Sequence, residues 1–175
     1  MIEVSFVRTA GAPDRVHVHR ADGTEASWSF PSYGDALPHD LVHLVVESSF
    51  GVKQGFWGRV AAGADPARVN ADANRRGGKN KYEAFGEDLR ELYLAEALAN
   101  ARWWDHSASD EDRRDDIARE CARSGGPLPP SVTLAAIGAV REELDRLRSR
   151  WRGLAPRGTL RASFESAQGS PSRRR

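Results

Sequence analysis

Four side chains of types that bind metals or transfer protons fall within one short segment of the chain, Leu37–Glu47. They are His39, Asp40, His43 and Glu47, and the segment contains no Lys, Arg, Gln or Ser. If the segment is a helix, these side chains share an arc of about 100°, and Leu and Val residues fill most of the remaining circumference. One stripe of a predicted helix therefore combines imidazoles with carboxylates, which is the composition of a metal site or an acid–base site.

His39 and His43 are four residues apart, so their imidazoles project from one helical face and can share a metal ion. His39 falls in the first helical turn, where exposed amide groups disfavour protonation and keep the ring neutral, as a ligand must be. The run His-Asp-Leu-Val-His resembles the His-Glu-x-x-His signature of the zinc peptidases called zincins, in which the carboxylate is the general base. Asp40 is one methylene shorter than the glutamate of that signature, so the chain departs from the family at the base.

Glu47 continues the same spacing, but it lies about 12 Å along the helix from His39, too far for one ion to bind both. We expect Asp40 or Glu47 to act as a base or to orient a ligand. For Glu47, the alternatives are a structural ion pair, or a place as ligand if His39 is not one. The third ligand should come from a long helix predicted over residues 82–104, in which Glu96 interrupts an apolar stripe. A buried carboxylate needs a partner. The predicted ligands of a mononuclear site are therefore His39, His43 and Glu96.

Two histidines and one carboxylate suit a divalent metal ion, zinc first and iron or manganese as alternatives, with one position left open for water. If the protein is an enzyme, this donor set favours hydrolysis by a metal-activated water. The partner would be a small molecule or a peptide. Other candidate ligands are Asp105 and His106, at the end of the long helix, and His17 and His19, whose arginine neighbours favour an exposed polar strand.

Two further interpretations of the same segment are open. An amphipathic helix must expose some residues, and the four polar side chains could be its solvent face, with Asp40 placed favourably near the helix N-terminus. The protein would then be a noncatalytic interaction or regulatory domain without a metal. In the third hypothesis, His39 and Asp40 transfer protons in an enzyme that needs no metal.

Alternation of apolar and polar residues predicts the small antiparallel sheet that would pack against this helix. Residues 2–8 alternate, and residues 15–30 form two alternating runs separated by Asp22 and Gly23, which is typical of a β-hairpin. Residues 159–164 alternate again and could return as a strand beside the hairpin. Strands first, then four to five helices, then one strand is the order of an α+β fold.

The predicted helical run continues after the histidine segment. Its helices are expected over residues 59–62, 82–104, 110–123 and 131–151. Residues 64–81 contain many Gly, Asn and Arg residues and are expected to form a connecting loop. The chain of 175 residues fits a single domain over residues 1–165, followed by a disordered basic tail at residues 166–175.

The composition indicates which kinds of partner and which cellular compartment to expect. The chain has 26 basic and 25 acidic residues and a net charge of +1, so we expect neither a nucleic acid nor a membrane as partner. Cys121 is the one cysteine, which excludes an internal disulfide and fits a reducing compartment. No leader-like segment and no apolar run of about 20 residues is present, so we expect a cytoplasmic protein.

Three segments taken in order resemble a small bacterial domain family that is uncharacterised. They are Phe30–Gly34, the Leu-Pro-His-Asp-Leu-Val-His-x-Val-Val-Glu run of Leu37–Glu47, and Gly55–Gly58. The resemblance covers residues 1–165 and implies a compact single domain, without implying an activity, a substrate or a partner. The sequence Gly-Phe-Trp-Gly of the last segment is itself typical of a packed corner, with a pocket wall as the alternative.

Overall fold

The structure is a computed structural model that describes residues 1–9, 12–30, 34–73, 89–123 and 126–165, with the backbone alone for residues 70–73. The strands in these parts of the chain are β1 (Ile2–Val7), β2 (Asp14–Arg20), β3 (Glu25–Phe30) and β4 (Thr159–Phe164). The helices are α1 (His39–Phe50), α2 (Phe56–Ala61), α3 (Pro66–Ala73), α5 (Arg90–Ala99), α6 (Asp110–Arg123) and α7 (Leu134–Arg152). The tail predicted to be disordered lies outside the described residues.

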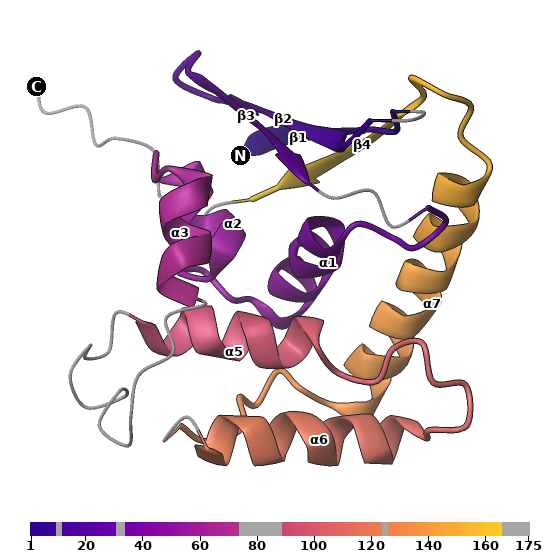
Figure 1. The fold of residues 1–175 in the computed structure, drawn as a ribbon. Coiled ribbons are helices and arrows are strands. Elements are labelled where there is room, and N and C mark those ends of the chain that lie inside the picture. The colour runs from indigo at the N-terminus through magenta and orange to yellow at the C-terminus, as the bar shows by residue number, and fades with distance from the viewer. Residues whose placement is uncertain (10–11, 31–33, 74–88, 124–125, 166–175) are drawn as a thin grey trace, which may run out of the picture.

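The four strands form one antiparallel sheet in the order β3-β2-β1-β4, and the helices lie on one side of it (Figure 1). This arrangement confirms the predicted α+β class, the N-terminal hairpin and the C-terminal strand. β4 pairs with β1, so β1 separates it from the β2–β3 hairpin. On β2, Val16 and Val18 are buried toward the helices, whereas His17 and His19 are exposed on the outer face. The exposure predicted for His17 and His19 is therefore confirmed, whereas Arg20, one of the arginines that favoured an exposed strand, is buried.

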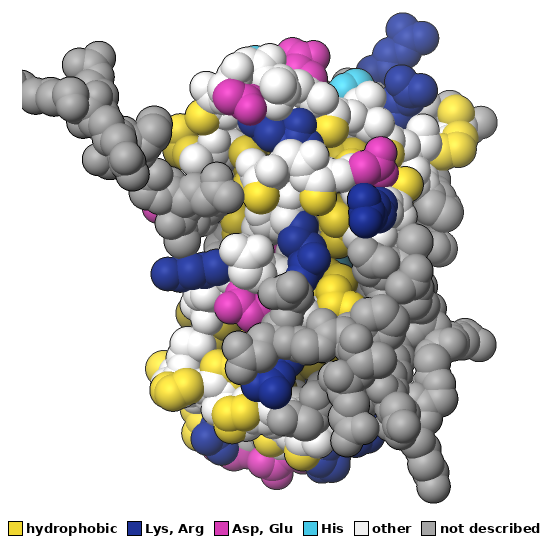
Figure 2. Space-filling view, turned by 90° about the vertical axis from the view of Figure 1, so that its left-hand side faces the viewer, with side chains coloured by type: hydrophobic (Ala, Val, Ile, Leu, Met, Phe, Trp, Pro, Cys, Tyr) yellow, Lys and Arg dark blue, Asp and Glu magenta, His cyan; other side chains and the backbone are white. Residues whose placement is uncertain are grey.

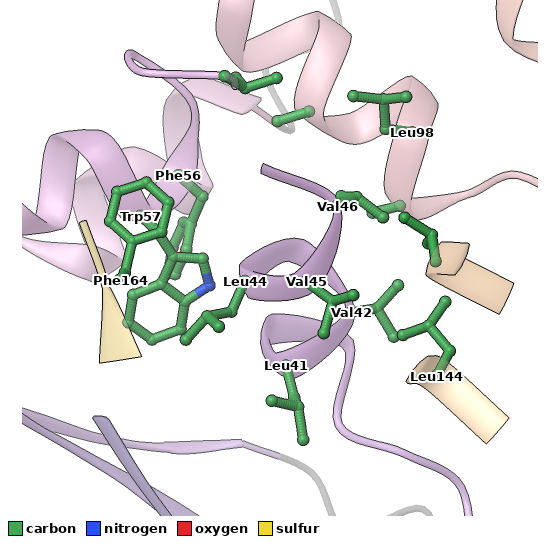
Figure 3. Packing of buried hydrophobic residues seen from close by; sticks show 14 of the residues in the cluster. Leu41, Val42, Leu44, Val45, Val46, Phe56, Trp57, Leu98, Leu144 and Phe164 are labelled. Carbon is green, nitrogen blue, oxygen red and sulfur yellow. The ribbon is translucent and has the colours of Figure 1, made fainter. Parts of the chain in front are cut away.

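Helix α1 lies in the middle of the helical layer, between the sheet, α5 and α7 (Figures 1 and 3). Its apolar side chains are buried, and each contributes about 1.5 to 3 kcal/mol by leaving water. These residues are Leu41, Val42, Leu44, Val45 and Val46, and they pack near Leu98 of α5, Leu144 of α7 and Phe164 of β4. His43 and Glu47 are also buried. The interpretation of the polar stripe as a solvent face is therefore wrong for these two residues.

In the described part of the chain, one predicted helix end and one predicted loop are wrong, and α2 begins at Phe56, before the predicted start at residue 59. α5 ends at Ala99 and does not continue to residue 104; Asn100 follows it, and its side-chain nitrogen donates to the carbonyl of Glu96 in the last turn. Residues 82–88, the predicted start of this helix, lie outside the described residues. Residues 66–73, expected to be loop, form α3, which brings the helices of the described residues to six.

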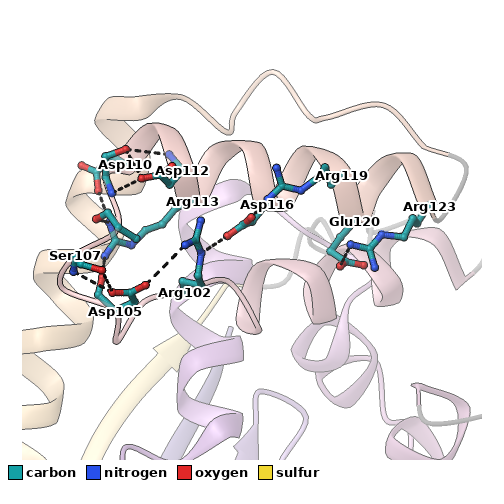
Figure 4. Close-up of polar contacts among 12 residues, drawn as sticks. Arg102, Asp105, Ser107, Asp110, Asp112, Arg113, Asp116, Arg119, Glu120 and Arg123 are labelled. Carbon is teal, nitrogen blue, oxygen red and sulfur yellow. Dashed lines mark hydrogen bonds and ion pairs between the residues drawn. The ribbon is translucent and has the colours of Figure 1, made fainter.

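A network of ion pairs and hydrogen bonds joins the turn after α5 to α6 (Figure 4). Arg102 pairs with Asp105 and with Asp116 of α6. Arg113 of α6 is buried and donates to the carbonyls of Asp105 and Ala108. These contacts fix the chain that follows α5, and so they help to hold α5 in place against α1.

The surface carries charges of both signs. On the face shown in Figure 2, basic and acidic side chains are interspersed among the described residues and do not gather by sign. The buried hydrophobic residues, from Ile2 to Phe164, form one cluster. Within the described part of the chain, none of the helices has the length and apolar character needed to cross a membrane.

Candidate metal centre

Two residues of α1 and one of α5 bring possible metal ligands together. Nε2 of His43 lies 3.4 Å from Oε1 of Glu96, and Nε2 of His39 lies 3.9 Å from Oε2 of the same carboxylate. One ligand atom from each residue can be chosen so that all three lie within 4.8 Å of one another. The ligands of a tetrahedral zinc ion are about 3.3 Å apart. The spacing of these atoms is close to that of ligands around one ion, so the group could hold a metal.

Local structure explains why these side chains meet. Residues four apart on a helix share a face, and the rings of His39 and His43 are 4.8 Å apart in an edge-on arrangement. The face of α5 toward the core includes Ala95 and Ala99, which are small and buried, so the two helices can pack closely. Glu96 follows Ala95 and reaches over α1. Its Oε2 atom also accepts a hydrogen bond from the side chain of Asn100.

The exposure of the three side chains increases from His43 to Glu96 to His39. The side chain of His43 is 3% exposed, that of Glu96 is 33% exposed and that of His39 is 48% exposed. The group thus extends from the core, at His43, to the surface, at His39. An ion held there would have protein ligands on its inner side and would face solvent beside His39, where water or another molecule could bind.

Glu47 contacts the other nitrogen of His43. Its carboxylate is fully buried, and Oε1 lies 3.4 Å from Nδ1 of His43. The same carboxylate accepts hydrogen bonds from the backbone nitrogens of Phe56 and Trp57, each 2.9 Å long. Glu47 is therefore fixed against the first turn of α2 and does not join the group formed by His39, His43 and Glu96.

Opposing effects set the charges of this cluster in the metal-free protein. Burial lowers the pKa of His43, but the carboxylates of Glu47 and Glu96 outweigh it and raise the pKa to about 9. Burial raises the pKa of Glu96, but the two histidines outweigh it and hold that pKa well below its usual range. Burial raises the pKa of Glu47 beyond what His43 and the backbone donors compensate. A proton on His43 therefore supplies the positive charge that a metal ion would supply.

Asp40 links the sheet to α1 and α2 beside the two histidines. Its Oδ2 atom accepts a hydrogen bond of 2.9 Å from Nε1 of Trp28 on β3, and its carbonyl accepts one of 2.7 Å from Nε1 of Trp57. Burial raises the pKa of the Asp40 carboxyl, although Trp28 and the charges of both histidines act in the opposite direction. Asp40 thus lies near the group without being one of its three members.

The other sequence candidates are not part of the group. His17 and His19 lie on the outer face of the sheet, and His106 follows Asp105 in the turn before α6. In the part of the chain that the structure describes, His39, His43 and Glu96 form the one group of its kind.

Sequence reasoning missed the donors that hold the acidic residues, namely Trp28 for Asp40 and the backbone of Phe56 and Trp57 for Glu47. The Gly-Phe-Trp-Gly run was a signal for the second, because it forms the packed corner around the Glu47 carboxylate.

Comparisons of the chain with models of protein families, with curated proteins and with solved structures found no match. The resemblance to a small bacterial domain family therefore stays a prediction. The geometry of His39, His43 and Glu96 is the observation that points to a function.

Proposed function

We propose that the protein binds one divalent metal ion through His39, His43 and Glu96 and that this ion activates a water molecule for hydrolysis. The observation that carries the proposal is the convergence of two imidazoles and a carboxylate, from α1 and α5, to within 4.8 Å. Two of these side chains are largely withdrawn from solvent. A buried carboxylate beside a buried imidazole is costly unless the charges are compensated, and a divalent cation compensates them.

The donor set favours zinc, with ferrous iron and manganese as alternatives. Zinc is commonly bound by imidazole nitrogens and carboxylate oxygens, and catalytic zinc sites use three protein ligands and one water. Two histidines and one carboxylate also form the ligand set of many ferrous iron sites. The half-exposed position of His39 leaves room for the water on the solvent side. A bound ion would lower the pKa of that water and make it a nucleophile.

The two remaining acidic residues are proposed to have different roles. Asp40 lies close enough to both histidines for their charges to act on its pKa, and we assign it as the base or as a residue that orients a ligand. Glu47 is fully buried and its contacts are with His43 and the backbone of α2. These contacts support orientation of His43 and oppose direct proton exchange with solvent.

Elemental analysis of untagged protein tests whether the protein binds a metal ion. We expect close to one equivalent of zinc, iron or manganese in the wild type and loss of that metal in His43→Ala. His19→Ala is the matched control, because His19 is an exposed histidine on the sheet, and it should retain the metal. Absence of metal from the wild type, even after incubation with zinc and dialysis, would contradict the proposal.

Hydrolysis is tested separately with ester, phosphodiester and peptide substrates. We expect activity that chelation removes, that added zinc restores and that Asp40→Asn lowers. Activity that survives chelation would favour the metal-independent hypothesis with His39 and Asp40. Bound metal without any hydrolysis would leave a metal-binding protein whose ion has another role and would contradict the hydrolase proposal.

A further inference from the structure

The two nitrogens of the His43 ring face different carboxylates. Nδ1 faces Oε1 of Glu47 on the core side, and Nε2 faces Oε1 of Glu96 on the solvent side, each at 3.4 Å. The contact at Nδ1 is a charge contact outside hydrogen-bond geometry, so this buried nitrogen has no hydrogen-bond partner among the described residues. A neutral imidazole carries hydrogen on one nitrogen and a lone pair on the other. An anionic acceptor at Nδ1 favours the form with hydrogen there, which leaves the lone pair of Nε2 for a metal. The negative charge of Glu47 beside Nδ1 therefore favours Nε2 as the nitrogen that would bind an ion.

The Glu47 side chain is held in place by burial and by hydrogen bonds. It is 0% exposed, and each of its oxygens accepts a backbone hydrogen bond from α2, from Phe56 at Oε1 and from Trp57 at Oε2. Two charge-assisted hydrogen bonds from adjacent backbone nitrogens fix both the place and the plane of a carboxylate. The orientation of His43 on α1 thus depends on the first turn of α2.

Gly55 provides the space that this contact requires. A Cβ atom at position 55 would lie 2.6 Å from Cδ and 2.7 Å from Oε2 of Glu47, far inside van der Waals contact. The backbone at Gly55 has φ of −72°, which other residues adopt readily. The absence of a side chain, and not backbone freedom, is therefore the property of glycine that matters here.

From these contacts we infer that Glu47 is a positioning residue of the metal centre and that Gly55 is required for it to act. The charge of Glu47 favours the form of His43 with hydrogen on Nδ1, which leaves Nε2 for the ion and strengthens the basicity of this ligand. This inference rests on the proposed metal site. Loss of such a partner of a metal-bound histidine lowers metal affinity by about 10- to 100-fold.

Zinc affinity, measured by competition with a chelating dye, tests both residues. We expect Glu47→Gln and Gly55→Ala each to weaken zinc binding by about 10- to 100-fold. If Gly55→Ala acts by displacing the Glu47 carboxylate, the double variant should be little worse than either single variant. The matched control is Gly138→Ala on α7, where the added Cβ would lie 3.2 Å from an oxygen of Asp110. It should leave zinc affinity unchanged.

A measurement on the wild type separates positioning from a general effect on folding and does not depend on any variant. In the zinc-loaded protein, nitrogen-15 NMR of the imidazoles should show His43 with hydrogen on Nδ1 and zinc on Nε2. Zinc on Nδ1 would overturn the inference, and so would unchanged zinc affinity in folded Glu47→Gln and Gly55→Ala. In these cases the wild type still binds zinc, so the proposed function stands. A wild type that takes up no zinc would overturn both.

Discussion

The Oε1 atom of Glu96 lies 3.4 Å from Nε2 of His43, so a carboxylate from α5 meets an imidazole from α1. Since Glu47 faces the other nitrogen of the same ring, His43 is buried between two acidic groups. Two carboxylates beside the ring favour a positive charge at His43. A proton supplies the charge in the metal-free protein, and a metal ion bound to His43 and Glu96 would replace that proton.

Glu96→Gln should lower zinc affinity by more than about 100-fold. This exceeds the loss expected when a residue that only orients a metal ligand is removed. Glutamine keeps the size of the side chain, but its neutral amide is a poorer ligand for a divalent ion than a carboxylate. The measurement is zinc affinity by competition with a chelating dye. Glu143→Gln is the control, because Glu143 is paired with Arg146 on α7 and should not affect zinc binding. Equal zinc affinity in the two variants would exclude Glu96 as a ligand.

The stability of the metal-free protein should depend on pH through His43. Its pKa in the folded protein is about 9, above the value of about 6.5 for an unfolded chain. The folded state therefore holds more protons between these two values, and the free energy of unfolding should fall as the pH rises from about 6.5 to 9. The contribution is fully present below about pH 6.5, and its upper bound is about 3 kcal/mol.

Urea unfolding with a chelator present, at several pH values, measures this dependence. The groups that face His43 are Glu47, Glu96, His39 and Asp40, and all of them remain in the control variant His43→Gln. We expect the control to show a flatter profile between pH 6.5 and 9. Identical slopes in the wild type and in His43→Gln would mean that His43 is not protonated in the folded state.

The sequence was sufficient to predict the part of the site that depends on one helix. The four-residue spacing of His39 and His43 fixes their common face, whatever the rest of the fold does. Glu96 was recognisable because a carboxylate in an apolar stripe requires a partner. The sheet was predictable for a similar reason, since alternation with a period of two is a local property of each strand.

Contacts between distant segments were not predictable in this way. The hydrogen bond from Trp28 to Asp40 depends on how the sheet is placed over α1, and the bonds from the α2 backbone to Glu47 depend on the path of residues 51–55. By contrast, the start of α3 has a local signal in the sequence. Asp65 accepts hydrogen bonds from the backbone of Ala67 and Arg68, and Pro66 occupies the first helical position, which together are typical of a helix start.

Trp28→Phe should destabilise the protein by about 1 to 3 kcal/mol, because the carboxylate of Asp40 loses the indole donor. Urea unfolding of the metal-free protein measures the change. In an Asp40→Ala background the same substitution should cost less, since the acceptor is already absent. An equal cost in both backgrounds would show that Trp28 contributes through packing alone. Trp104→Phe is the control, as Trp104 is 38% exposed, and its effect should stay below about 1 kcal/mol.

The end of α1 should be more sensitive to Gly→Ala than the end of α7. Gly51 follows α1 with φ of 71°, whereas Gly153 follows α7 with φ of −78°. A Cβ at Gly51 would meet no atom within 4 Å, and one at Gly153 would make ordinary contacts of 3.6 Å. The two positions therefore differ in backbone conformation and not in available space.

Alanine at Gly51 must adopt a left-handed conformation, so Gly51→Ala should lower the free energy of unfolding by about 1 to 2 kcal/mol. Gly153→Ala should be neutral or stabilise the protein by up to about 1 kcal/mol, because alanine restricts the unfolded chain. Urea unfolding of both variants measures this difference. Neither variant should alter zinc affinity under conditions where the protein is folded, since neither glycine contacts a proposed ligand. A loss of zinc affinity in Gly51→Ala alone would mean that the turn after α1 also determines the positions of His39 and His43.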